Sequence, residues 1–239
     1  MKGLYDMHCH IVPGVDDGAD NMEEAVKMLK LEYEEGVRHI IATPHFRFNM
    51  FETPLETVLE QFEALKKEAA HIGDEGIDLH LGCEFHVNLN MAEMLREKKV
   101  LTMAGSRYVL VEFSGPAKKS QVRERLYSLV SSGYKPIIAH VERCSELRSD
   151  VGFIEEMVEM GAKVQINAES IIGKEGFRVK RFCTRLMKED LLHFVGTDSH
   201  GSSFRVPKMK EAYAYVEKKM GEEYAEQIFI VNPAKLIKK

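Results

Sequence analysis

The chain has 239 residues, of which 44% are apolar and 30% are charged, as is typical of a soluble globular protein with a substantial core. No apolar segment approaches the roughly 18–20 residues of a membrane helix, and the first residues, MKGLYDMHCH, lack the apolar core of a signal peptide. The formal net charge of −5 comes from 33 basic and 38 acidic residues without basic blocks, which argues against nucleic acid as the main partner.

The four cysteines, Cys9, Cys83, Cys144 and Cys183, form neither a CxxC pair nor a disulfide-dense pattern. We therefore expect reduced thiols and a cytoplasmic protein. None of the four is followed six positions later by arginine, as a cysteine-dependent tyrosine phosphatase requires, and no DxD pair suited to aspartyl-phosphate chemistry occurs.

Apolar, β-branched segments alternate along the chain with amphipathic segments of helical period. Strands are expected at Leu4–Ile11, Val37–His45, Ile77–Val87, Tyr108–Ser114, Lys135–Glu142, Lys163–Ala168 and His193–His200. Asp20 and Glu23 resemble a capping box at the start of the first helix, and Gly36 closes it. The second helix follows Thr53 and Pro54, and the last 39 residues are expected to be helical. No linker or repeat divides the chain, so one domain is expected over residues 1–239.

Alternating strands and helices predict a parallel sheet, either open and doubly wound or closed into a barrel. One polar residue stands near the end of each expected strand: His10, His45, Glu84, Glu112, His140, Asn167 and Asp198. Their spacing of 27 to 39 residues is close to the roughly 31 residues per unit of a (β/α)8 barrel. An open sheet places its site at one switch point, whereas a barrel gathers all strand ends at one mouth. We therefore predict an α/β fold with a distorted seven-stranded (β/α)7 barrel.

The polar residues at the strand ends are of metal-ligand type. His8 and His10 lie two positions apart, so both should face one side of their strand while Met7 and Cys9 face the other. Asp198 and His200 repeat this spacing. Glu84 and Glu112 interrupt apolar strands, where a buried carboxylate is costly unless it is paired or bound to metal. A single pair of histidines with this spacing is only weak support for a metal site.

Together, five histidines and four carboxylates are predicted to meet at the barrel mouth: His8, His10, Asp17, His45, Glu84, Glu112, His140, Asp198 and His200. Asp17 stands in VDDG, which by itself is also compatible with an ordinary Asp-Gly turn. Nine ligands are too many for one ion and suit two or three. Mixed imidazole and carboxylate ligation is compatible with Mn, Fe or Zn and does not choose among them.

Short motifs along almost the whole chain resemble those of the PHP superfamily. They are HCH at 8–10, VDDG at 15–18, IATPH at 41–45, GCE at 82–84, VEF at 111–113, IAHVER at 138–143 and TDSH at 197–200. Within that superfamily, the chain is most similar to the bacterial metal-dependent protein-tyrosine phosphatases of capsule and exopolysaccharide gene clusters. The resemblance implies the same nine ligands, a distorted seven-stranded barrel and three divalent ions, with manganese favoured. It also implies phosphate-binding arginines at Arg143 and Arg205.

The resemblance further implies a phosphomonoesterase in which metal-activated hydroxide attacks the phosphorus of phosphotyrosine in line. Its substrate would be the tyrosine-rich tail of a bacterial tyrosine kinase that controls polysaccharide synthesis. Two alternatives remain open, namely a small-molecule phosphatase of the histidinol-phosphatase kind and a barrel that binds metal without catalysis. Arg47 and His86 lie close to predicted ligands, and the sequence does not decide whether they take part.

Overall fold

The computed structural model describes residues 3–237, which contain nine strands in two parallel sheets. One sheet has the order β1-β2-β4 and consists of β1 (Leu4–Cys9), β2 (Val37–Ala42) and β4 (Asp78–Leu81). The other has the order β3-β5-β6-β7-β8-β9 and consists of β3 (His45–Phe46), β5 (Glu84–His86), β6 (Tyr108–Glu112), β7 (Lys135–Ile138), β8 (Lys163–Asn167) and β9 (Phe194–Gly196). Every strand pairing is parallel.

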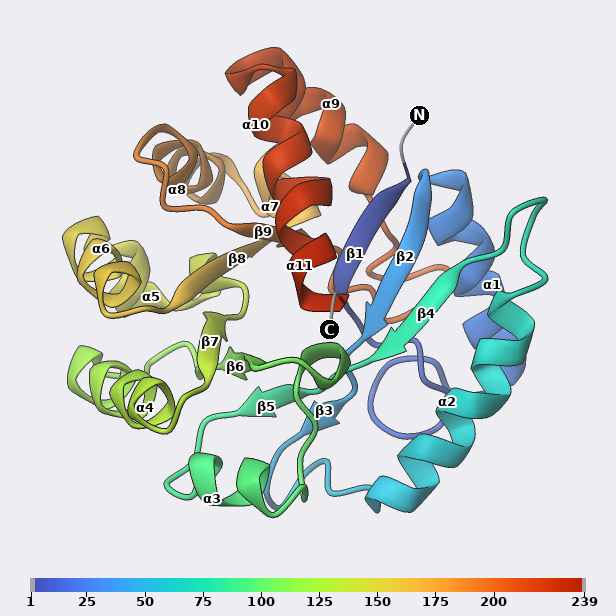
Figure 1. Ribbon diagram of the computed structural model, residues 1–239. Coiled ribbons are helices and arrows are strands. Elements are labelled where there is room, and N and C mark those ends of the chain that lie inside the picture. Colours follow the sequence, from blue (N-terminus) through green and yellow to red (C-terminus); the bar gives the residue numbers. More distant parts are fainter. Residues whose placement is uncertain (1–2, 238–239) are drawn as a thin grey trace.

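The two sheets curl around a common centre, with the helices outside (Figure 1). They meet where β1 and β9 end, through a parallel bridge between Cys9 and Ser199. Two backbone hydrogen bonds support this junction, from Asp198 N to His8 O at 2.7 Å and from His10 N to Ser199 O at 2.9 Å. The prediction of an α/β fold with a distorted, curled parallel barrel is therefore confirmed.

Two of the expected strands are each broken in two, and this explains the distortion. The segment expected to be one strand at Val37–His45 forms β2 and β3, separated at Pro44, which has no N–H to donate to a ladder. The segment Ile77–Val87 forms β4 and β5, separated at Gly82. A Cβ at Gly82 would lie 2.9 Å from Met103 Sδ and 3.1 Å from Ile41 Cγ2, so glycine allows the chain to pass close to these side chains.

The longer helices cover the outer faces of the sheets. They are α1 (Met22–Glu34), α2 (Leu55–Ala69), α4 (Lys119–Ser131), α6 (Val151–Glu159), α8 (Phe177–Lys188) and α9 (Met209–Met220). There are also four short helices, α3 (Met91–Arg96), α5 (Ser145–Arg148), α7 (Ala168–Ile172) and α10 (Glu222–Glu226). A further short helix, α11 (Asn232–Ile237), lies across one end of the barrel (Figure 1). The helical character expected for the last 39 residues is thus found from Met209 to Ile237. The predicted cap of α1 is one residue too early, because Asn21, not Asp20, accepts the N–H of Glu24.

An apolar cluster fills the barrel at the end covered by α11, where Leu236 joins Met7, Met103 and Leu110. A larger cluster, which includes Cys9, fills the space between sheets and helices. The prediction that Met7 and Cys9 share one side of β1 is wrong, because register shifts between Asp6 and Cys9 interrupt the alternation of side chains. Within residues 3–237, no helix combines the length and the apolar character needed to cross a membrane.

Candidate metal centre

The predicted ligands gather where the parallel strands end, because the carboxyl ends of all strands face one mouth of the barrel. Four of them lie within strands or at their edges: His8 on β1, His45 on β3, Glu84 on β5 and Glu112 on β6. The others stand on the connecting loops. In particular, Asp198 and His200 lie beyond β9, not within a strand as expected.

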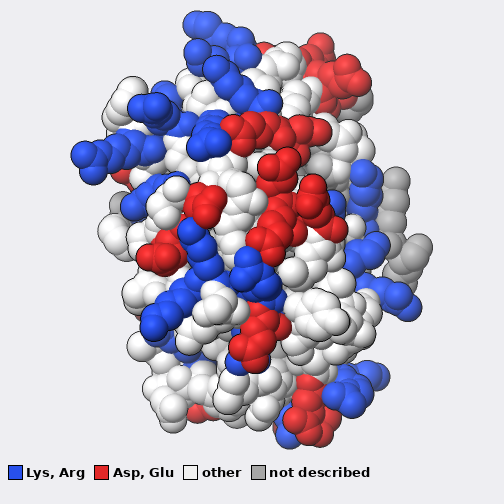
Figure 2. Space-filling view, turned by 90° about the vertical axis from the view of Figure 1, so that its left-hand side faces the viewer, with Lys and Arg blue, Asp and Glu red and all other residues white. Residues whose placement is uncertain are grey.

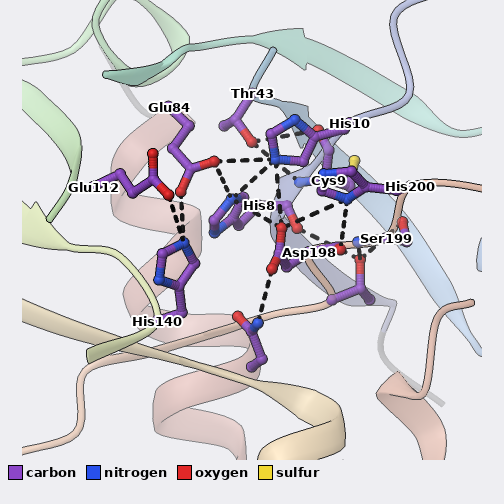
Figure 3. A network of polar contacts seen from close by, with 12 residues as sticks. His8, Cys9, His10, Thr43, Glu84, Glu112, His140, Asp198, Ser199 and His200 are labelled. Carbon is purple, nitrogen blue, oxygen red and sulfur yellow. Dashed lines mark hydrogen bonds and ion pairs between the residues drawn. The ribbon is translucent and has the colours of Figure 1, made fainter. Parts of the chain in front are cut away.

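Four buried side chains form the centre of the site. The Nε2 atom of His8 lies 3.2 Å from Glu84 Oε2 and 3.5 Å from Asp198 Oδ1, and His10 Nε2 lies 3.1 and 3.4 Å from the same two atoms. Figure 3 shows these imidazoles and carboxylates pointing toward one another. The four ligand atoms all lie within 4.8 Å of one another, a group compact enough to hold one ion.

A second group lies toward the rim and consists of His10, Asp17, His45 and His200. Asp17 Oδ1 lies 3.6 Å from the Nε2 atoms of both His45 and His200, and the Asp17 side chain is half exposed. His10 therefore belongs to this group as well as to the central one. The Asp-Gly turn expected from VDDG is also present, but its hydrogen bond is made by Asp16.

A third group consists of His45, Glu84 and Glu112. His140 lies beside it, with Nε2 at 2.7 Å from Glu84 Oε1 and 4.0 Å from Glu112 Oε1. The structure thus brings eight of the nine predicted ligands together in three overlapping groups, and the ninth, His140, contacts Glu84 of the third group. Glu84 is shared by two of the groups, as a carboxylate that bridges two ions would be.

The chemistry of these side chains fits divalent ions. Four buried ligand atoms form no hydrogen bond within the described part of the chain: His45 Nδ1, Glu84 Oε2, Glu112 Oε2 and His200 Nε2. Imidazole nitrogens of His8, His10 and His45 lie 3.1–3.2 Å from Glu84 Oε2 without forming a hydrogen bond. Buried polar atoms without hydrogen bonds are costly, and cations would satisfy all four. Mixed nitrogen and oxygen donors are the ligands of Mn, Fe and Zn in proteins.

Three predicted ligands, Glu84, His45 and His200, are already in the protonation state that binds metal. Burial opposes ionisation of Glu84, but the charges of His8 and His140 outweigh it and hold its pKa well below the usual range. Burial and the charge of His10 lower the pKa of His45 to about 4, and burial lowers that of His200 to about 3. Neutral imidazoles and ionised carboxylates are the forms that bind metal. His10 and His140 would have to release a proton first, because, although burial opposes it, neighbouring carboxylates hold the pKa of His10 well above its usual range and raise that of His140 to about 9.

Asp16 was not singled out from the sequence, although it is the better buried of the two aspartates in VDDG. Its Oδ2 atom lies 2.7 Å from His10 Nδ1 and accepts the N–H of His45 at 2.9 Å. Its Oδ1 atom accepts the N–H of Gly18 at 3.0 Å. A Cβ at Gly18 would lie 2.0 Å from His10 O, so glycine is required for this close approach. The paired aspartates before glycine were a signal that could have indicated this role.

Gln165 and Asn167 of β8 also contact predicted ligands. Asn167 was expected at the mouth as a strand-end residue, but neither residue was given this positioning role from the sequence. Gln165 Oε1 accepts the N–H of His140 at 2.7 Å and lies 3.2 Å from His8 Nδ1. Asn167 donates to Asp198 Oδ2 at 2.9 Å. Their separation by two residues on one strand was the available signal, because both side chains face the barrel interior.

Arg143 and Arg205 converge on the same site. Each donates to Asp198 Oδ2, and Arg143 also lies 3.2 Å from Glu175. The Nε atom of Arg205 is buried and finds no acceptor within residues 3–237. Asp198 and Arg205 have φ angles of 53° and 49°, a left-handed conformation that is uncommon outside glycine and often marks functional sites.

His86 and Arg47 lie beside Glu112. His86 Nε2 is 2.9 Å from Ser114 Oγ, and burial together with the charge of Arg47 lowers the pKa of His86. His86 is thus held neutral next to the site. The other histidines without a predicted role make separate contacts: His39 and His80 with Asp78, His71 with Lys67 O and His193 with Lys163.

Comparison with known proteins gives a family for the whole chain. Residues 4–238 match the family described as capsular polysaccharide synthesis, CpsB/CapC. The tyrosine-protein phosphatase CpsB of Streptococcus pneumoniae is 34% identical over 98% of both chains. The tyrosine-protein phosphatase YwqE of Bacillus subtilis is 33% identical over 92% of this chain and 86% of its own.

Solved structures agree with this assignment. A structure described as belonging to YwqE from Bacillus subtilis and CpsB from Streptococcus pneumoniae, "unique metal-dependent tyrosine phosphatases", matches with a TM-score of 0.90 and 31% identity over 98% of this chain and 94% of that one. A phosphotriesterase homology protein from Escherichia coli matches with a TM-score of 0.61 at 14% identity, which shows a shared fold alone. The match over almost the full length, in sequence and in fold, shows that this chain belongs to the CpsB/CapC family of capsular polysaccharide synthesis.

Proposed function

We propose that this chain is a metal-dependent protein-tyrosine phosphatase, a phosphoric monoester hydrolase. The observation that carries the proposal is the meeting of nine metal-ligand side chains with two arginine side chains at one mouth of the barrel. Cations and arginines together favour a phosphate monoester dianion over a neutral substrate. The names of the relatives CpsB and YwqE support phosphotyrosine in a protein as the substrate.

We assign three divalent ions to the three overlapping ligand groups. His8, His10, Glu84 and Asp198 would hold one; Asp17, His45 and His200 a second; and Glu84, Glu112 and His140 a third, so that the carboxylate of Glu84 is shared by the first and the third. Manganese is the first choice, and Fe or Zn suits the same ligands. Bound there, such ions would act as Lewis acids on the phosphoryl group and lower the pKa of water toward neutrality.

The two arginines would orient the phosphoryl group. Arg143 and Arg205 both contact the Oδ2 atom of Asp198, so a phosphate beside this carboxylate would be within reach of both guanidinium groups. Bidentate, charge-assisted hydrogen bonds to phosphate oxygens would fix the phosphorus for in-line attack. Glu175 keeps Arg143 in place, because its Oε1 atom accepts from both Nε and Nη2 at 3.2 Å. The tyrosyl leaving group has a pKa near 10, so it needs less protonation than an alkyl alcohol.

The physiological substrate in this proposal is the tyrosine-rich tail of a bacterial tyrosine kinase that regulates capsular or exopolysaccharide synthesis in the cytoplasm. Membership of a capsular polysaccharide family supports this substrate. The kinase is proposed from the family's link to capsular polysaccharide synthesis and not from the fold, because one fold can serve many different functions.

The test combines elemental analysis of the purified protein with hydrolysis of a phosphotyrosyl peptide before and after chelation. We expect divalent metal in the protein, activity that chelation abolishes, and recovery when manganese is restored. Histidinol phosphate at the same concentration serves as the competing substrate and should be turned over far more slowly. Full activity in excess chelator with no bound metal would refute the proposal.

A further inference from the structure

A basic groove separates α8 from α9 on the outer layer of the barrel. It has a volume of about 410 Å³ and is lined by five basic residues, Lys180, Arg181, Arg185, Lys188 and Lys219, against a single acidic residue, Glu189. Figure 2 shows lysine and arginine side chains gathered in the upper left of this face, where α8 lies, while acidic side chains predominate to their right. Such a concentration of positive charge stands out in a chain with a net charge of −5.

Most of this positive charge is not neutralised within the protein. Arg185 pairs with Glu189 at 2.7 Å, and Lys180 lies 4.2 Å from the ring centroid of Tyr215. Among residues 3–237, no carboxylate lies within 4.0 Å of Arg181, Lys188 or Lys219, and all three side chains are exposed. Unpaired cations in a groove favour an anionic ligand.

The groove begins next to the proposed phosphate site. Phe177, the first residue of α8, lines the groove and is 79% exposed. Two residues earlier, Glu175 lies 3.2 Å from Arg143. A chain whose phosphotyrosine reached Arg143 would therefore pass Phe177 on entering the groove.

The shape and the spread of charge favour a polypeptide. The basic positions from Lys180 to Lys188 span about 12 Å along the helix axis, at about 1.5 Å per residue. About four residues of extended chain cover the same length. Single carboxylates along an extended segment match this distributed charge better than one phosphate, which requires converging arginines. A flat bilayer would reach only the rims of a groove.

We propose that the groove between α8 and α9 binds an acidic segment of the substrate polypeptide, rich in Asp and Glu and adjacent to the phosphotyrosine. This inference rests on the proposed phosphatase activity at the mouth of the barrel. It adds that the enzyme prefers phosphotyrosyl proteins in which acidic residues lie next to the phosphotyrosine. The contact is electrostatic and exposed, so it should affect substrate capture more than the chemical step.

The test measures kcat/KM of the metal-loaded enzyme on two pairs of phosphotyrosyl peptides. Each pair compares an Asp/Glu-rich segment with a Gly/Ser-rich segment, which precedes the phosphotyrosine in one pair and follows it in the other. In one of the two pairs, the kcat/KM of the wild type should be about tenfold higher for the acidic peptide than for the neutral one at low salt. This preference should disappear at about 0.5 M salt. The double variant Arg181→Glu/Lys188→Glu should lose it at low salt as well. Lys66→Glu/Lys67→Glu on α2, exposed and equal in charge change, is the matched control and should keep it.

Para-nitrophenyl phosphate has no flanking residues, so all variants should hydrolyse it equally. Binding of a labelled, unphosphorylated acidic peptide, followed by fluorescence anisotropy, tests the groove independently of catalysis. Three outcomes would overturn the inference. They are equal kcat/KM for acidic and neutral peptides, an equal loss of preference in the control variant, and binding of phosphatidylserine vesicles without binding of the peptide. If no phosphotyrosyl peptide is hydrolysed, the proposed function fails, and the anisotropy measurement still decides whether the groove binds acidic peptides.

Discussion

The carboxylate of Asp16 lies 2.7 Å from Nδ1 of His10 and thereby turns the other ring nitrogen, Nε2, toward Glu84 and Asp198. Burial opposes ionisation of Asp16, but the charge of His10 and three hydrogen bonds lower its pKa to about 2. Asp16 is therefore an ionised acceptor at neutral pH. An imidazole oriented in this way is a better metal ligand, because its tautomer and its direction are set before the ion arrives.

Asp16→Ala should weaken metal binding about 10–100-fold, as loss of a carboxylate behind a ligating histidine does elsewhere. Asp16→Asn keeps one hydrogen bond and should lie between Ala and wild type. The affinity is measured by isothermal titration calorimetry, in which the metal ion is titrated into protein from which a chelator has removed the metal. Asp20→Asn, at a neighbouring exposed position, should bind metal as the wild type does. Unchanged affinity in both Asp16 variants would show that the contact is not used.

Arg205→Ala should reduce the rate of phosphotyrosyl-peptide hydrolysis on the order of 10²-fold, by analogy with loss of a donor to a developing negative charge. Arg205→Lys should recover only part of the rate, since an ammonium group cannot present a guanidinium fork. Metal content should be unchanged in both, because Asp198 turns its Oδ1 atom, not the Oδ2 atom bound by Arg205, toward His8 and His10. Near-normal turnover in Arg205→Ala would remove this residue from the mechanism.

Replacement of all four cysteines by serine or alanine should leave most of the activity, apart from the effect of altered packing on stability. Cys9, Cys83, Cys144 and Cys183 are all buried, and burial raises the pKa of Cys9 and Cys83 well above the usual range. A buried thiol with a raised pKa is a poor nucleophile. Alkylation of the native enzyme should likewise spare hydrolysis, whereas chelation should stop it. An inactive, folded and fully metallated cysteine-free variant would contradict a metal mechanism.

His193 should make the stability of the protein depend on pH below neutrality. Burial and the charge of Lys163 lower its pKa to about 4, against about 6.5 in the unfolded chain. The unfolded state therefore takes up the proton first, and stability is lost as the pH falls from about 6.5 to about 4. His193 is only partly buried, so we expect a loss of about 1–2 kcal/mol.

His193→Gln removes this titration. As the pH falls, the free energy of unfolding of the variant should therefore decrease less than that of the wild type. Urea unfolding of both metal-loaded proteins at pH 7 and pH 5 measures the difference. A difference in unfolding free energy that does not change with pH would show that His193 does not titrate between the two states.

The meeting of the predicted ligands at one mouth of the barrel could be predicted from the sequence. The two-residue spacing of His8 and His10 predicts that they face the same side, and a barrel of parallel strands brings the carboxyl ends of all its strands to one mouth. A carboxylate such as Glu84 in an apolar strand also has few stable alternatives to ligation or pairing. These are local rules, and the sequence contains all that they require.

Only the tertiary structure decided how the strands break and which residues hold the ligands. The break between β4 and β5 lies at Gly82, which packs close to Met103, 21 positions further along the chain, and the register shifts of β1 arise in its pairing with β2. The roles of Asp16 and Gln165 follow from contacts with residues on other strands. Contacts of this kind depend on register and loop conformation, which the whole packed molecule determines and which no periodic pattern encodes.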